Sequence, residues 1–107
     1  MDVYYLPDYE RRARRLFTED EQKAAELEIV GAPLLWPVIP GTGGARKARA
    51  ARGGKGKSGG ARIIYYFMTQ GDAIYLLDVY AKGEKEDLSD DQKNKIRKLI
   101  EALEAEG

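Results

Sequence analysis

Two apolar segments in the second half of the chain most constrain its fold. Residues 62–68 and 73–81 are rich in β-branched and aromatic side chains, a composition typical of β-strands. The short polar turn Gln70-Gly71-Asp72 between them predicts an antiparallel hairpin. Because both segments are largely apolar on both faces, we expect them at the centre of a sheet, covered by helices on one side.

The N-terminal third predicts one strand followed by two helices. Residues 2–6 have the composition of a short strand, Pro7 ends it, and Asp8 is expected to cap the first helix. Residues 18–21, Thr-Glu-Asp-Glu, fit a capping box that opens a second helix, which is expected to end near Gly31.

The remaining segments complete an α+β pattern. Residues 32–44, with three prolines and three glycines, predict an irregular crossover that packs down on the core. Residues 45–52 lead into the glycine-rich segment 53–60, which predicts a flexible loop or a wide hairpin turn. A capping box at 89–92 opens a last helix. We therefore expect one domain over residues 1–107, with an antiparallel sheet of three to four central strands packed against two N-terminal helices, and a C-terminal helix.

The chain contains no cysteine and no histidine. Disulfides, a Cys nucleophile, an imidazole base and nearly all transition-metal sites are thereby excluded, so any catalysis must use Lys, Arg, Tyr, Ser or carboxylates, and we expect no metal and no cofactor. No apolar run approaches the roughly 20 residues that cross a bilayer, and the N-terminus lacks the pattern of a signal peptide. We expect a cytoplasmic protein without a membrane partner.

Positive charge is concentrated in the middle of the chain, although the net charge is zero. No acidic residue lies between Glu28 and Asp72, whereas that interval holds seven cations: Arg46, Lys47, Arg49, Arg52, Lys55, Lys57 and Arg62. Such segregation predicts a polyanionic partner, and we expect RNA or phosphate binding by these residues. If residues 45–52 are extended, Lys47 and Arg49 share one face and Arg46 points to the other.

Aromatic side chains on the predicted strands could stack on bases, although strand aromatics are usually buried. We expect a core position for most of the four tyrosines at 65, 66, 75 and 80. Tyr80, near the end of its strand and close to Lys82, is the best candidate for base stacking. Asp78 stands alone in an apolar strand, which favours a structural hydrogen-bonding role over that of a base.

An ordered series of short motifs resembles a known family. The series comprises IPGTGG at 39–44, GKSGG at 56–60, RIIYY at 62–66, YAK at 80–82, EK at 84–85 and LS at 88–89. It is similar to the HigB-like branch of the RelE/ParE toxin superfamily, from about residue 4 to residue 103. The resemblance implies the toxin of a type II toxin–antitoxin pair, which enters the ribosomal A site and cleaves messenger RNA there. It also implies neutralisation by a co-encoded antitoxin, HigA-like and of the helix-turn-helix type.

The same resemblance implies roles for five residues. Arg62, which precedes the hydrophobic strand, matches the arginine that contacts the scissile phosphate, and Lys55 and Lys57 match the loop lysines that supply charge and proton transfer. Where RelE carries a second catalytic arginine, this chain offers Lys82 or Lys85. The implied reaction is attack of the RNA 2′-hydroxyl on the adjacent phosphorus, giving a 2′,3′-cyclic phosphate and a 5′-hydroxyl.

Two other functions remain open. A ParE-like gyrase inhibitor shares this fold without the nuclease role, and a non-catalytic RNA-binding module would use the same cations. The lysine-rich glycine segment favours the nuclease over the gyrase inhibitor.

Overall fold

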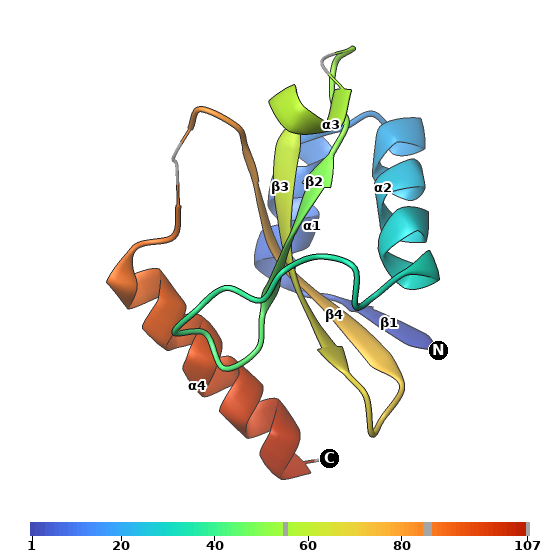
Figure 1. Cartoon of the computed structure of the whole chain (residues 1–107). Coiled ribbons are helices and arrows are strands. Elements are labelled where there is room, and N and C mark those ends of the chain that lie inside the picture. Colours follow the sequence, from blue (N-terminus) through green and yellow to red (C-terminus); the bar gives the residue numbers. More distant parts are fainter. Residues whose placement is uncertain (55, 85–86, 107) are drawn as a thin grey trace.

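The computed structural model describes residues 1–54, 56–84 and 87–106, with the backbone but not the side chains of residues 57 and 58. Its elements follow the order β1 (Asp2–Tyr5), α1 (Pro7–Leu16), α2 (Glu19–Gly31), β2 (Arg46–Ala50), α3 (Gly56–Gly59), β3 (Ala61–Met68), β4 (Ala73–Ala81) and α4 (Asp90–Glu106) (Figure 1). None of the helices in the described ranges is both long enough and apolar enough to span a bilayer.

The four strands form one mixed sheet in the order β1-β4-β3-β2. The predicted hairpin is confirmed, since β3 and β4 pair antiparallel, and β2 also pairs antiparallel with β3. The expectation of an antiparallel sheet is wrong for β1, which runs parallel to β4. A hairpin forces its strands to be antiparallel, whereas β1 and β4 are far apart in sequence and no such constraint sets their direction.

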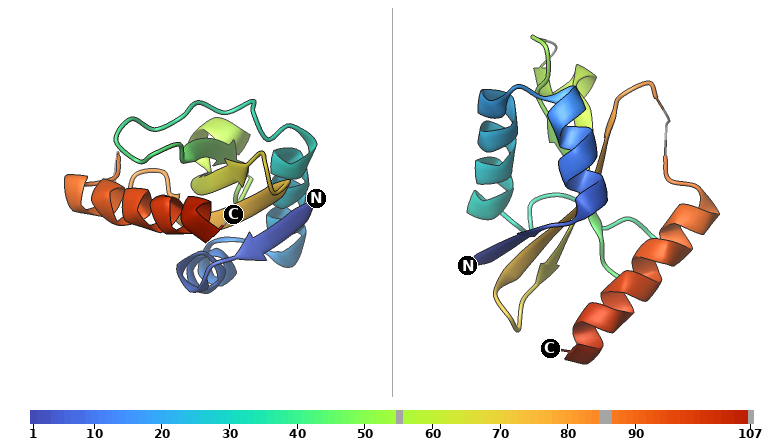
Figure 2. Two further views of the ribbon diagram at one scale, coloured as in Figure 1. Left: turned by 90° about the horizontal axis from the view of Figure 1, so that it is seen from below. Right: turned by 180° about the vertical axis from the view of Figure 1, so that it is seen from behind.

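Helices cover both faces of the sheet, so the expectation of one covered side is also wrong. On one face, Tyr9 of α1 and Ile29 of α2 pack in a core cluster with Ile63. On the other, Ile100 of α4 packs with Ile64. Figures 1 and 2 show α4 on the opposite side of the strands from α2. Neighbouring side chains of a strand point to opposite faces, so a strand that is apolar at consecutive positions needs a cover on each side.

The helix starts follow capping chemistry. The predicted capping box of α2 is confirmed, because Glu21 N–H donates to Thr18 Oγ1 at 3.1 Å and Thr18 N–H donates to Glu21 Oε1 at 2.9 Å. For α1 the expected cap is wrong. Leu6 is the N-cap and Pro7 is the first helical residue, because proline has the helical φ already fixed and lacks the N–H that a cap would satisfy. Asp8 lies inside the first turn.

The glycine-rich segment joins the antiparallel strands β2 and β3, which confirms the wide hairpin turn among the two alternatives expected, and residues 56–59 within it form the single helical turn α3. Glycines 53, 54 and 56 adopt positive φ on the way into it, a conformation that other residues rarely reach. Gly60 closes the segment so tightly that a Cβ there would lie 2.1 Å from the carbonyl oxygen of Ala50. Gly60, immediately before the start of β3, therefore lies directly against the end of β2.

Candidate functional site

Strand register brings three of the predicted site residues side by side. Arg49 of β2 pairs with Arg62 of β3, and Arg62 pairs with Tyr80 of β4. The alternation of the strands places Lys47, Arg49 and Arg62 on the sheet face that α4 covers farther along, as predicted for Lys47 and Arg49. Lys82, two residues beyond Tyr80, continues the same row by alternation.

We call Lys47, Arg49, Arg62 and Lys82 the cationic strip. Arg49, Arg62 and Lys82 lie at the end of the sheet where β2 ends, β3 begins and β4 ends, near α3 (Figure 1), and Lys47 lies two residues farther back along β2. Lys82 is exposed, and its backbone N–H donates to the Gly60 carbonyl at 3.0 Å, so the end of β4 is tied to the start of β3. Three strands thus present four cations at one corner of the sheet.

The two arginines of the strip are held differently. The guanidinium of Arg49 lies over the ring of Trp36, 5.5 Å from its centroid, an arrangement that attracts a cation to the π-face. Arg62 is half-buried, and its Nη1 donates to the Ala61 carbonyl at 3.2 Å. Both guanidinium groups are thereby oriented by the sheet and by the crossover segment that contains Trp36.

A carboxylate from the β4–α4 connection joins this site. Lys47 Nζ lies 3.9 Å from Asp87 Oδ1, with the Lys47 side chain 31% exposed and that of Asp87 54% exposed. Burial raises the pKa of the Tyr80 hydroxyl, the negative charge of Asp87 raises it further, and the positive charge of Arg62 opposes both. Asp87 therefore faces both the strip and Tyr80, 40 residues from Lys47 in sequence, and the sequence carries no periodic signal for that contact.

Tyr80 itself belongs to the core. It is only 3% exposed and packs in the α4-face cluster, so little of its ring is available for stacking on a base. Tyr65 and Tyr66 are also buried and Tyr75 is partly buried, which confirms the expected core position for most of the strand tyrosines.

Two predicted RNA-binding cations lie apart from the strip. Arg46 Nη1 donates to the Trp36 carbonyl at 2.6 Å and to the Leu34 carbonyl at 3.4 Å. Arg52 Nε donates to the Leu16 carbonyl at 3.1 Å, at the end of α1. These contacts direct Arg46 to the crossover segment and Arg52 to the α1–α2 junction, so neither joins the row of Arg49 and Arg62.

Three predicted site residues lie wholly or partly outside the described part of the structure. Lys55 and Lys85 lie outside the described residues. Lys57 lies in α3, beside the strip in sequence and topology, but its side chain is outside the described part of the structure.

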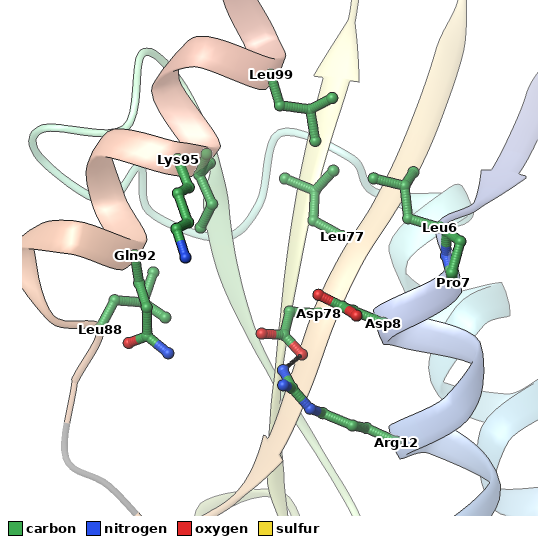
Figure 3. Close-up of a pocket in the computed structure, with 11 residues that line it drawn as sticks. Leu6, Pro7, Asp8, Arg12, Leu77, Asp78, Leu88, Gln92, Lys95 and Leu99 are labelled. Atoms are coloured by element: carbon green, nitrogen blue, oxygen red, sulfur yellow. Dashed lines mark hydrogen bonds and ion pairs between the residues drawn. The ribbon is translucent and has the colours of Figure 1, made fainter.

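A separate cavity of about 380 Å³ lies between α1, β4 and α4 (Figure 3). Arg12 Nη1 pairs with Asp78 Oδ1 at 2.5 Å on its wall, which confirms the structural role expected for Asp78. Leucines 6, 77, 88 and 99 give the cavity an apolar lining, and no residue of the cationic strip lines it.

The mixed four-stranded sheet, helices on both faces and cations at one corner define an α+β protein with a candidate anion-binding site. A model of the family described as "RelE toxin of RelE / RelB toxin-antitoxin system" matches residues 41–106. Since the match spans more than half of the chain, this protein belongs to the RelE toxin family.

Solved structures of E. coli RelE have the same fold as this chain. The isolated E. coli RelE toxin matches with a TM-score of 0.61 at 14% identity, over 97% of this chain and 96% of that one. A chain of the intact E. coli RelBE toxin–antitoxin complex matches with a TM-score of 0.60 at 16% identity, over 78% and 98%. A free E. coli RelE with two arginines mutated to alanine matches with a TM-score of 0.59 at 13% identity, over 79% and 86%. At these identities the likeness is one of fold.

Proposed function

We propose that this chain is the toxin of a type II toxin–antitoxin pair and acts in the cytoplasm as a ribosome-dependent endoribonuclease on messenger RNA. The observation that carries the proposal is the register of Arg49 with Arg62, which places two arginines at directly paired positions of β2 and β3, with Lys47 two residues before Arg49. A planar guanidinium pairs with two phosphate oxygens and stays protonated at any physiological pH. Because β2 and β3 are hydrogen-bonded neighbours, the backbone positions of Arg49 and Arg62 are fixed relative to each other.

The chemistry proposed for this corner is transesterification. The 2′-oxygen bonds to phosphorus, the bond to the 5′-oxygen breaks, and negative charge gathers on the non-bridging phosphoryl oxygens. Arg62 is oriented by β3 before the substrate arrives, and such preorganised donors stabilise a transition state without having to reorganise. A lysine ammonium near the strip supplies the proton for the leaving 5′-oxygen, a role for which Lys57 and Lys82 are the candidates.

The substitution Arg62→Ala tests the proposal. Removing one preorganised donor commonly lowers the rate about 100- to 1,000-fold, so induced expression of R62A should leave cells growing. The matched control is Arg11→Ala, which removes an arginine that is 59% exposed on α1 and pairs with Asp8. R11A should remain fully toxic.

A translating extract separates the rival functions. Codon-positioned cuts by wild-type protein, lost in R62A, support the nuclease. Inhibition of gyrase supercoiling without RNA cleavage would replace it with a ParE-like function, and RNA binding without cleavage would replace it with a binding module. A fully toxic, well-expressed R62A would reject the role assigned to Arg62.

The proposed partner is a co-encoded antitoxin, of the HigA-like helix-turn-helix type if the resemblance to that branch holds. The E. coli RelBE structure is that of a toxin–antitoxin complex, and a member of the RelE family is expected to be neutralised in the same way. Co-expression of the adjacent small open reading frame should restore growth.

A further inference from the structure

We infer that Asp87 is the proton acceptor for the attacking 2′-hydroxyl in the proposed RNA cleavage. The inference rests on the proposed function and adds a residue that it does not use. It begins from the position of Asp87, whose carboxylate lies 3.9 Å from the ammonium of Lys47 on the same corner of the sheet as Arg62 and Tyr80.

The Asp87 carboxylate is held in place through one oxygen, and its other oxygen can accept a proton. Leu88 N–H donates to Asp87 Oδ1 at 2.8 Å, which fixes the side chain, while the 3.9 Å separation from Lys47 is longer than a hydrogen bond. Both of these contacts use Oδ1, so Oδ2 is the oxygen assigned to take the proton. With 54% of its side chain exposed, Asp87 can be reached by a nucleotide lying along the strip.

A stabilising ion pair is the weaker explanation for this contact. Pairs of exposed side chains at such distances contribute little to stability, and a carboxylate weakens the attraction of a cationic surface for RNA. A base, by contrast, is what a histidine-free site needs. A lysine ammonium can only donate a proton, whereas a carboxylate oxygen can accept one.

The step balances without any further reactant. The 2′-hydroxyl proton passes to Asp87 Oδ2, the 2′-oxygen bonds to phosphorus, and the bond from phosphorus to the 5′-oxygen breaks. The 5′-oxygen leaves with a proton from a lysine ammonium, giving a 2′,3′-cyclic phosphate and a 5′-hydroxyl. Lys47 beside Asp87 and Arg62 on the next strand donate to the phosphate oxygens.

The test compares Asp87→Asn with Asp87→Glu and with Asp91→Asn, a matched control at an exposed position of α4. Single-turnover cleavage is measured on programmed ribosomes, using messenger RNA with either the natural 5′-oxygen or a bridging 5′-sulfur at the cut site. General-base catalysis contributes about 100- to 10,000-fold, so D87N should lose that factor while D87E keeps more of the rate and D91N keeps all of it.

The 5′-sulfur distinguishes a base from an acid. Sulfur leaves without protonation, so it rescues the loss of an acid and not the loss of a base, and D87N should remain slow on that substrate. Ribosome binding by D87N should be at least as tight as that by D91N, and the thermal melting of the two variants should match. Normal cleavage by D87N, or its rescue by sulfur, would overturn this inference alone. A wild-type protein that cuts no messenger RNA would overturn the proposed function together with it.

Discussion

The salt dependence of RNA binding provides a quantitative test of the cationic strip. Each phosphate contact on a single strand contributes about −0.7 to the slope of log affinity against log salt. The four cations Lys47, Arg49, Arg62 and Lys82 therefore contribute about −2.8 together, which corresponds to a roughly 50-fold loss of affinity between about 50 and 200 mM salt. Cations outside the strip add the same amount to the slope for every variant, so their contribution cancels when the slopes of two variants are compared.

Single substitutions should divide the central cations into two classes. Arg62→Gln or Lys47→Gln should make the slope shallower by about 0.7. Arg46→Gln and Arg52→Gln remove the same charge, but those side chains already donate to the backbone carbonyls of Trp36 and Leu16. Their slopes should equal that of the wild type, and their affinities should stay close to it at every salt concentration.

Fluorescence anisotropy of a short single-stranded RNA with 2′-O-methyl groups measures this without cleavage. Circular dichroism of each variant shows whether the fold is retained. If R46Q and R52Q flatten the slope as much as R62Q does, all the central cations contribute equally to RNA binding. The distinction between the strip and the other cations would then be wrong.

Two further predictions concern the scaffold. Gly60→Ala should destabilise the fold by at least about 1–3 kcal/mol in urea denaturation, because its Cβ would meet the Ala50 carbonyl at 2.1 Å, whereas Gly31→Ala, where nothing lies within 4 Å, should be tolerated. Burial and the hydrogen bond to Glu26 raise the pKa of Tyr9 above its ordinary value of 10.0, so the folded state holds this proton more tightly. That contribution to stability is present below pH 10 and is lost above it, as the unfolded chain ionises; Tyr9→Phe should show a shallower alkaline loss of stability.

The local features of the fold could be predicted because each depends on neighbouring residues. The capping box at Thr18 and Glu21 needs only a spacing of three, and the β3–β4 hairpin needs only a polar turn between two apolar runs. Once β2 is extended, alternation alone puts Lys47 and Arg49 on one face. The pairing of Arg49 with Arg62 was not predicted, because a connection as long as residues 51–60 does not fix the strand register.

Features that join distant segments could not be predicted in this way. The direction of β1 depends on which strand edge it meets after the helices have packed. The contact of Lys47 with Asp87, and the hydrogen bond from Arg52 to the Leu16 carbonyl, join segments whose sequences contain no matching pattern. Arg52 was expected to join the other cations because charge was counted along the chain, whereas its direction is set by a helix end that lies next to it only in the folded state.

The pairing of Arg49 with Arg62 has a consequence for stability as well as for binding. Like charges directly opposite each other on neighbouring strands are destabilising, so the pairing of Arg49 with Arg62 places two positively charged residues at repelling positions. An anion bound between them relieves this repulsion, and a ligand that binds only the native state at ten times its Kd stabilises it by about 1.4 kcal/mol. Inorganic phosphate should therefore raise the Tm of the wild type above that in chloride at equal ionic strength, and raise that of Arg62→Gln much less. An equal rise in both proteins would mean that phosphate acts through general salt effects and that this arginine pair is not an anion site.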